Sequence, residues 1–279
     1  MKPNPEFNKM PKSFWASVRS ISQHCGYTVR GKDTVKEPSE KEIAKAFSEL
    51  GLAAKALNAT VNGKTLLEQL IGYFEHRALV LNRDIKPALM NADEAKHLFE
   101  SLRKKLKPKC PLPMNKQKGA KKAPAYLTGI VNMLIEANSH GLTVDYDPRE
   151  LTTVTKNGTP LRTLSRRVDG AFPATVNPIA IWEIKEYYYT TTFGSRVADG
   201  VYETLLDGME IEELAQTEKI DVKHYLFLDA RYTWWDCGKS YLCRIVDMVH
   251  MGYVDEVLVG KRIVDRLPAL VRTWLPSKA

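Results

Sequence analysis

Apolar residues recur every three or four positions through the first third of the chain, a spacing that places them on one face of a helix. Ser39 and Glu42 form a capping box at the start of one such stretch. The first 35 residues show only one or two short helical pieces. The pattern therefore predicts helices at residues 39–50, 65–82 and 92–106.

The second half of the chain has a different pattern. A helical period covers residues 125–140, and short β-branched and aromatic runs then alternate with helical stretches. The Asn-Gly pair within residues 156–159 is typical of a hairpin turn. The predicted order is strand 149–155, strand 161–172, strand 179–189, helix 197–216, strand 222–228, helix 240–251 and strand 256–259. We therefore expect an α/β fold with a mixed central sheet flanked by helices, joined to an N-terminal helical region.

A proline-rich, basic stretch separates the two patterns. Proline interrupts helices and central strands, so it favours a loop here. We expect a mostly helical region at 1–123, with a basic linker at 101–123, and an α/β core at 124–279. A solvated linker and a phosphate-contacting segment both fit this composition. The basic residues are Arg103, Lys104, Lys105, Lys107, Lys109, Lys116, Lys118, Lys121 and Lys122.

Composition narrows the class of partner. The formal net charge of +8 favours an acidic partner such as nucleic acid. No apolar run approaches the length of a membrane span, and the N-terminus lacks the apolar segment of a secretory signal. The four cysteines are scattered, which suits a reducing cytoplasm better than a disulfide framework. We expect a cytoplasmic protein with no membrane partner.

Glu183 and Lys185 interrupt the apolar run of the third predicted strand. A buried strand carries such charges only where other groups compensate them. Residues 172–178 have the prolines and Asn of a turn, and a hairpin centred near Val176 sets Asp169 opposite Glu183. Facing Cβ atoms lie roughly 4.5–5.5 Å apart. Two carboxylates that close repel each other unless a divalent cation lies between them, and Lys185 points to the same face as Glu183.

Two carboxylates and a lysine suit metal-dependent hydrolysis of a phosphodiester. A metal ion polarises the phosphoryl oxygen and lowers the pKa of a bound water, while a lysine orients that water and offsets developing negative charge. At these residues the sequence resembles the PD-(D/E)xK nuclease superfamily, most closely its type II restriction endonucleases. Asp169 matches the first acid, Glu183 the second and Lys185 the lysine, whereas Val168 stands where the family often has proline.

The resemblance covers about residues 125–259 and implies a restriction-endonuclease-like core. It implies Mg²⁺ held by Asp169, Glu183 and the backbone carbonyl of Ile184, with Lys185 positioning the attacking water. It also implies double-stranded DNA as substrate in a bacterial or archaeal cell. A two-fold dimer is the simplest way to cut both strands, so we expect a homodimer.

Further candidates surround this motif. Glu136 and Glu203, on the helices before and after the sheet, are second-rank metal ligands; the alternative is an ordinary helix carboxylate. Glu186 alternates to the other face, where we expect a salt bridge. Basic and hydroxyl side chains near the motif are candidates for contacting DNA phosphates or bases. They are Arg166, Arg167, Tyr187, Thr191, Arg196, Lys118, Lys121 and Lys122.

We therefore expect a site-specific, metal-dependent DNA endonuclease of the type II restriction kind. Alternatives within the nucleases are a junction resolvase, a repair nuclease and an RNA nuclease. A DNA-binding protein that keeps the fold without catalysis is a rival from another class. The last alternative is that the motif is accidental and that Glu183 and Lys185 form an ordinary ion pair. The recognition sequence and cut position stay open, because base readout depends on loop placement.

Overall fold

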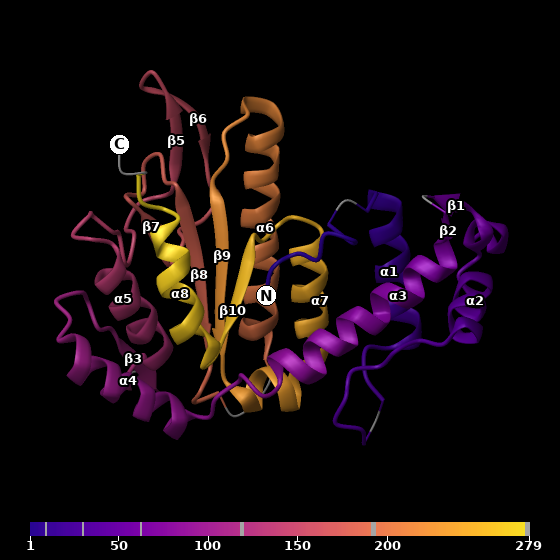
Figure 1. Ribbon diagram of the computed structural model, residues 1–279, viewed down its shortest axis with the longest axis horizontal. Helices are drawn as coiled ribbons and strands as arrows, with labels where there is room; N and C mark the ends of the chain where they lie inside the picture. The colour runs from indigo at the N-terminus through magenta and orange to yellow at the C-terminus, as the bar shows by residue number, and fades with distance from the viewer. Residues whose placement is uncertain (9, 30, 62, 118–119, 191–193, 277–279) are drawn as a thin grey trace.

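The computed structural model describes residues 1–8, 10–29, 31–61, 63–117, 120–190 and 194–276. The N-terminal part is helical, as the periodicity predicts, and lies to one side of the sheet (Figure 1). Its shared core buries large aromatic side chains, including Phe14, Trp15, Phe47 and Phe74. The Ser39–Glu42 capping box is present. The helices are α1 (Lys12–Cys25), α2 (Glu40–Glu49) and α3 (Leu66–Leu79), the last continued by a π-helical turn at Val80–Ile85.

A mixed sheet of four strands forms the centre of the remaining chain, in the order β10-β9-β8-β7. Strands β8, β9 and β10 are parallel, and the three-residue β7 runs antiparallel to β8 at the edge. The strands are β7 (Gly170–Phe172), β8 (Ala180–Glu186), β9 (Lys223–Asp229) and β10 (Glu256–Val259). β8 and β9 are almost entirely buried, and they carry Glu183, Lys185 and Asp229 among their apolar residues.

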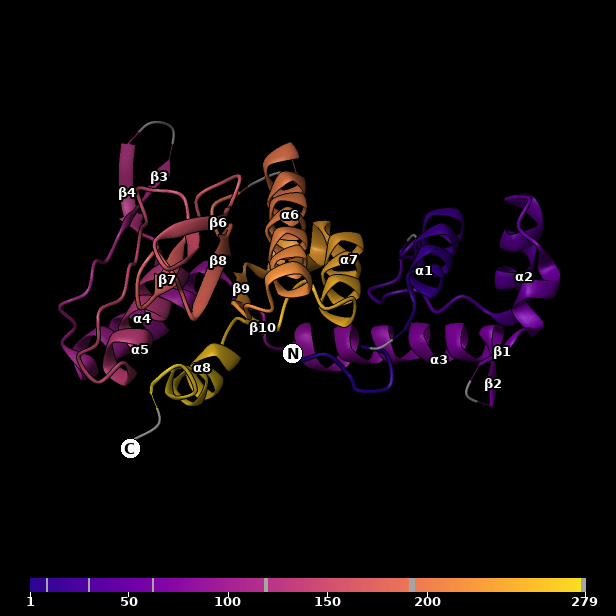
Figure 2. The same ribbon diagram turned by 90° about the horizontal axis from the view of Figure 1, so that it is seen from above.

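Helices cover both faces of the sheet (Figure 2). One cluster of buried apolar side chains joins α4, α5 and α8 to one face, with Trp182 stacked on Trp274. A second cluster joins α6 and α7 to the other face. These helices are α4 (Ala92–Leu106), α5 (Tyr126–Asn138), α6 (Ser195–Glu218), α7 (Lys239–His250) and α8 (Arg262–Arg272). The fold is therefore α/β with a helix–sheet–helix arrangement.

The three-stranded meander expected before the fourth strand is wrong. β5 (Thr153–Lys156) and β6 (Thr159–Thr163) form a separate two-stranded ribbon. The chain leaves strand geometry before β7 because its polar groups bond to α6 instead of to the sheet. The Ser165 backbone and hydroxyl both donate to Glu210 of α6, at 3.0 and 2.8 Å. The predicted strand 161–172 is therefore split by contacts with a distant helix.

The expected basic linker contains regular structure. β3 (Met114–Gln117) and β4 (Ala120–Pro124) form an antiparallel hairpin. The segment before it is fixed to α5, since the Asn132 amide donates to the Pro111 carbonyl at 2.9 Å. α4, which precedes it, packs in the same apolar cluster as α5. Residues 101–117 thus belong to the body that carries the sheet. Within the described chain, no helix is long and apolar enough to cross a membrane.

Two histidines meet where α3 packs on α7. The Nε2 atoms of His76 and His250 lie 3.1 Å apart, and the Nδ1 atom of His250 lies 2.8 Å from the Val246 carbonyl. A neutral His250 that donates from Nδ1 can accept from His76 at Nε2. Burial lowers the pKa of His250 to about 4. The folded protein therefore resists protonation of this ring.

Acidification is expected to weaken the fold through His250. Since its folded pKa lies below the ordinary 6.5, its stabilising contribution is complete above that pH and is lost as pH falls toward 4. The free energy of unfolding should fall by about 2 kcal/mol from this group between pH 7 and pH 5. Urea titrations of wild type and His250→Gln at both pH values measure the difference. Equal pH dependence in the two proteins would contradict the assignment.

Candidate active site

The motif residues lie at the carboxyl end of β8, beside the start of β7. Gly170 faces Trp182 across the two strands, so the next pair outward is Asp169 with Glu183. A Cβ at Gly170 would lie 2.1 Å from the Trp182 ring. The glycine therefore lets β7 approach β8 closely and brings Asp169 beside Glu183. In sheets with parallel strands, this end of the strands is the usual place for a ligand site.

Asp169 is half-buried and lines a cleft. Its Oδ2 accepts a hydrogen bond from the Ile184 amide at 2.7 Å. Oδ1 has no hydrogen-bond partner in the part of the chain that the structure describes. Burial, with the nearby Glu183 carboxylate, raises the pKa of Asp169 to about 6. Burial therefore disfavours the charged form of this carboxylate, and a cation bound beside it would favour that form.

The Ile184 carbonyl points toward the same place as its amide. In a strand, the amide and carbonyl of one residue face the same neighbour, and alternate residues face opposite neighbours. The Trp182 carbonyl accepts from the Asp169 amide, so Trp182 and Ile184 both face the β7 side. β7 begins only at Gly170, which leaves the Ile184 carbonyl beyond the start of that strand, beside Asp169. Ile184 also lines the cleft.

Glu183 is fully buried and held by two cations. Its Oε1 lies 2.9 Å from Nη1 of Arg166, and its Oε2 accepts from Nζ of Lys185 at 2.7 Å. Burial alone would raise the pKa of Glu183, but Lys185 and Arg166 overcome it and hold that pKa below its ordinary value. Burial works against the charge of Lys185, yet Glu183 and Asp169 raise its pKa. Both residues are therefore charged at neutral pH.

α6 adds two further acids to the cluster. Oε2 of Glu203 lies 3.2 Å from Nζ of Lys185 and 3.3 Å from Nη2 of Arg166. Asp207, one turn later, contacts Nη1 of Arg166 at 2.6 Å. Burial and Glu183 raise the pKa of Asp207 to about 7. The sequence analysis missed Asp207, although its spacing of four from Glu203 puts both acids on one face of the helix.

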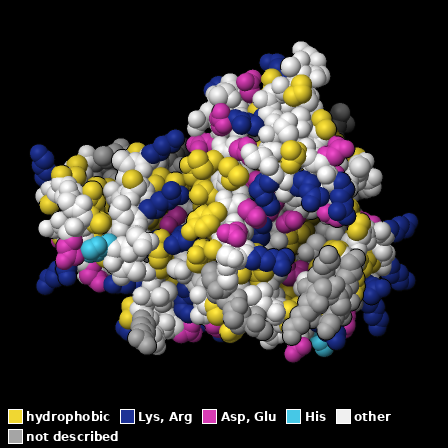
Figure 3. Space-filling view, turned by 180° about the vertical axis from the view of Figure 1, so that it is seen from behind, with side chains coloured by type: hydrophobic (Ala, Val, Ile, Leu, Met, Phe, Trp, Pro, Cys, Tyr) yellow, Lys and Arg dark blue, Asp and Glu magenta, His cyan; other side chains and the backbone are white. Residues whose placement is uncertain are grey.

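Two adjoining cavities of about 450 Å³ each form a cleft in front of this cluster. Both are lined by Asp169, Ile184 and Arg196, and the first also by Lys185 and Arg166. The side of the molecule behind the view of Figure 1 carries basic and acidic side chains interspersed with hydrophobic ones (Figure 3). The cleft itself is polar and mixed in charge, because arginine, lysine, aspartate and glutamate side chains all line it.

The salt bridge expected of Glu186 is wrong, and Glu136 lies away from the cleft, in keeping with the ordinary helix carboxylate that was its alternative role. Glu186 forms no salt bridge within the described residues; its Oε2 accepts from the amide and hydroxyl of Thr128, at 3.0 and 3.2 Å, and so caps the start of α5. Burial raises the pKa of Glu186 to about 7. Glu136 accepts twice from the Lys109 amide, and it does not line the cleft. It is therefore a capping group for the segment after α4.

The candidate DNA contacts divide into three groups. Tyr187 and Arg196 line the cleft together with Arg166. Arg167 points away from it and donates to the Pro148 carbonyl at 3.4 Å. The remaining candidates cannot be placed: Thr191 and Lys118 lie outside the described residues, and Lys121 and Lys122 are described only as backbone of β4.

Gly200 of α6 makes room for Lys185. A Cβ at Gly200 would lie 2.9 Å from the Tyr187 hydroxyl and 3.2 Å from Cδ of Lys185. Gly200→Ala should therefore displace the lysine by a few tenths of an ångström. Alanine also favours the helix by about 0.5–1 kcal/mol, so the fold should survive.

We expect Gly200→Ala to lower any turnover at this site roughly tenfold without lowering stability, because small misplacements of a catalytic group are costly. Turnover and urea unfolding measured on the same preparation check this. Gly72→Ala is the control, since a Cβ at Gly72 meets nothing within 4 Å. A fully active Gly200→Ala protein would show that the position of Lys185 is unimportant.

The chain belongs to the family described as Domain of unknown function (DUF7687), which matches residues 90–274. Residues 1–84 match a second family, described as Domain of unknown function (DUF7690). The two matches meet between α3 and α4, where the helical N-terminal part joins the body that carries the sheet. No curated protein and no solved structure shows a significant match to the chain.

Proposed function

We propose that the chain is a metal-dependent DNA endonuclease with a restriction-endonuclease-like core, of the type II restriction kind. The observation that carries the proposal is the convergence of Asp169, Glu183 and Lys185 at one end of β8, where a polar cleft opens. Glu183 and Lys185 are buried in the sheet, where charges are costly to keep, and Asp169 lies half-buried beside them. Perturbed charges at a cleft are typical of functional sites.

The residues present fit a hard cation. No group of three or more His, Cys, Asp or Glu side chains within the described chain is arranged to hold a metal ion. Asp169, Glu183 and the Ile184 carbonyl nevertheless offer oxygen atoms only, which Mg²⁺ prefers. Among the described residues, Oδ1 of Asp169 has no hydrogen-bond partner. A bound Mg²⁺ would polarise the phosphoryl oxygen and lower the pKa of a bound water. It would share Glu183 with Arg166 and Lys185.

The chain's own residues would then do the following. Lys185, at the floor of the cleft, would orient the attacking water and offset negative charge on the phosphate in the transition state. Glu203 fixes the lysine from the α6 side. Arg196 and Tyr187 line the cleft where the flanking DNA backbone would lie. The basic β3–β4 hairpin borders it through Asn115 and would extend the contact.

Incubation with plasmid and phage DNA in the presence of Mg²⁺ tests the proposal. Discrete fragments from wild type, absent with EDTA and absent with Asp169→Asn, are the expected result. The asparagine keeps the size of the side chain and can still accept from the Ile184 amide. No cleavage of any DNA substrate under Mg²⁺ or Mn²⁺ would overturn the proposal.

One observation favours a rival without catalysis. Both oxygens of Glu183 are already engaged by cations, as in a site whose charges serve the fold. A DNA-binding protein of this kind would retain DNA in a mobility-shift assay and leave it intact under Mg²⁺. Glu183→Gln would then lower stability and leave binding unchanged.

We propose that the active form is a homodimer acting on double-stranded DNA, because a two-fold dimer presents two sites to two strands. Leu206 and Met209 of α6 are 42% and 50% exposed and offer apolar surface to a second copy. Light scattering after size exclusion, on wild type and Leu206→Glu, tests this. A monomer that cuts both strands would contradict it.

A further inference from the structure

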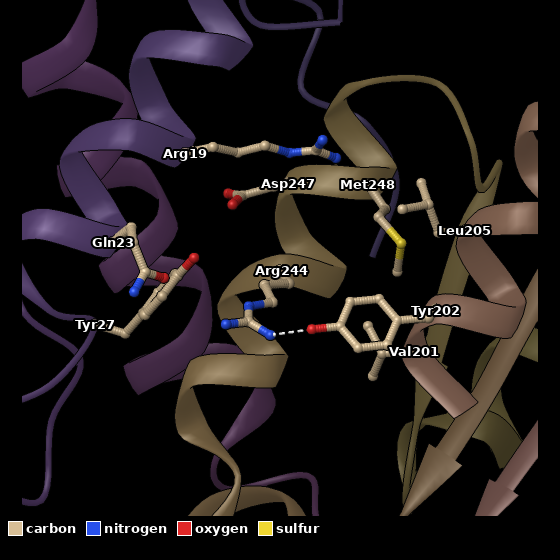
Figure 4. Close-up of a pocket in the computed structure, with 9 residues that line it drawn as sticks. All are labelled: Arg19, Gln23, Tyr27, Val201, Tyr202, Leu205, Arg244, Asp247 and Met248. Carbon is tan, nitrogen blue, oxygen red and sulfur yellow. Dashed lines mark hydrogen bonds between the residues drawn. The ribbon is translucent and has the colours of Figure 1, made fainter. Parts of the chain in front are cut away.

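A second pocket lies between the two family regions, across α6 from the cleft. Its volume is about 290 Å³. Figure 4 shows the residues that line it. It shares no lining residue with the cleft among those described. α1 supplies Arg19 and Gln23, with Tyr27 following that helix, and α6 and α7 supply the opposite walls. Pockets at the junction of two folded units are common ligand sites.

Two arginines in this pocket have no acidic partner. Within the described residues, no carboxylate lies in ion-pair distance of Arg19 or Arg244. Arg19 donates only to the thioether of Met251 at 3.4 Å, a weak acceptor. Arg244 donates to the Tyr202 hydroxyl at 2.8 Å (Figure 4). Arg244 also hydrogen-bonds the Tyr27 side chain and lies over the Tyr241 ring at 4.5 Å. Arg19 therefore keeps most of its hydrogen-bonding capacity for a ligand, and Arg244 keeps part of it.

The nearest acid does not supply the missing charge. Asp247 lines the pocket, but Arg77 holds it at 3.2 Å and the Tyr73 hydroxyl donates to it at 2.5 Å. Its carboxylate is 2% exposed. With its charge met by Arg77, the pocket keeps two uncompensated positive charges.

The rest of the lining is apolar and aromatic. Val201, Leu205 and Met248 form one wall. The guanidinium of Arg244 lies over the Tyr27 ring at 5.4 Å, and the Tyr202 ring is half exposed beside it. Arginine planes and tyrosine rings are the groups on which nucleobases stack. The pocket therefore combines an anion site with a flat apolar site.

We propose that this pocket binds the phosphate and base of one nucleotide, a nucleoside monophosphate. Arg19 and Arg244 would bind the phosphate, because guanidinium groups bind phosphate through paired N–H donors. The exposed Tyr202 ring and the aliphatic wall of Val201, Leu205 and Met248 would contact the base, because Arg77 and Arg244 already lie over the Tyr27 ring. The small volume fits one nucleotide and excludes a duplex. A free mononucleotide and the phosphorylated end of a DNA strand present the same chemistry.

Calorimetric titration of the full chain tests this site. The probes are the four nucleoside 5′-monophosphates, adenosine, inorganic phosphate, and a short single-stranded oligonucleotide with and without a 5′-phosphate. We expect saturable 1:1 binding of at least one mononucleotide, about tenfold or more tighter than phosphate or adenosine alone. Binding of the phosphorylated oligonucleotide and of no free mononucleotide assigns the site to strand ends.

Arg244→Gln and Arg19→Gln should each weaken the binding about tenfold or more, since each removes a charge-assisted contact. Arg272→Gln removes the same charge from α8, on the opposite face of the sheet, and should bind as wild type. Urea unfolding without ligand shows whether each variant is folded. If Arg244→Gln does not fold, the binding measured with Arg19→Gln tests the proposal. Arg19 is exposed, so its substitution should not affect folding.

The proposal is overturned if no probe binds up to millimolar concentration. It is also overturned if phosphate alone binds as tightly as the mononucleotides, or if binding persists in both arginine variants. Its outcome is independent of cleavage, since Asp169→Asn should bind the mononucleotide unchanged.

Discussion

Lys185→Met should abolish DNA cleavage at this site, with a loss of roughly 10²–10³-fold or more, the effect of removing one donor that stabilises transition-state charge. The fold should survive the change. Glu183 keeps its contact with Arg166, so no buried carboxylate is left without a cation. Cleavage rates under Mg²⁺ and the free energy of unfolding are the measurements.

The matched control is Lys223→Met on β9, the neighbouring strand. Lys223 is partly exposed and pairs with Asp221 and Asp255, away from the cleft. The Lys223→Met substitution removes the same charge as Lys185→Met. It should leave the cleavage rate within about twofold of wild type, because exposed ion pairs contribute little to stability. If the Lys185→Met protein is folded and fully active, Lys185 has no role in the cleavage reaction.

Arg77→Met should destabilise the protein by about 3–5 kcal/mol, the usual result of removing one partner of a buried ion pair. Arg77 is fully buried on α3. Its Nη1 donates to Ser22 of α1 at 3.1 Å and lies 3.2 Å from Asp247 of α7. The substitution therefore leaves Asp247 charged and buried, with only Tyr73 donating to it. Urea unfolding followed by tryptophan fluorescence measures the loss.

The double variant Arg77→Met with Asp247→Leu should recover much of that stability, because replacing both ions by apolar groups of similar size is often neutral or better. Arg272→Met, which removes an exposed arginine from α8, is the control for the loss of one charge. A fall of under about 1 kcal/mol in Arg77→Met would show that the pair does not join the two family regions.

The sequence pattern predicted the helices, strands and side-chain positions that depend on residues close together in the chain. The helix 92–106 and the strand 256–259 were placed with their observed limits. The facing of Asp169 and Glu183 followed from the position of the turn between their strands, and the register of β7 with β8 agrees with it. Alternation along β8 also placed Lys185 on the side of Glu183. These features depend on residues within about twenty positions of one another.

Features decided by distant packing were missed. The spacing of four places Asp207 on the same face of α6 as Glu203, but only the packing of α6 against the segment before β7 brings Asp207 into contact with Arg166. That same contact splits the expected strand at Ser165. The sequence pattern did not predict α8, which contains Pro268, because proline usually ends a helix. Its buried Leu267 and Val271 show that packing on the sheet outweighed that preference.

Both edges of the central sheet are closed. At β10, the Val257 amide donates to the Met1 carbonyl at 2.9 Å, and the Met1 amino group donates back to the Val257 carbonyl. At β7, Ala171 exchanges two hydrogen bonds with Asp145, at 2.9 and 3.0 Å. Open edges are where sheets recruit strands from other chains. The chain's own segments therefore occupy the middle of each edge strand, which disfavours the addition of a strand from another copy at these positions.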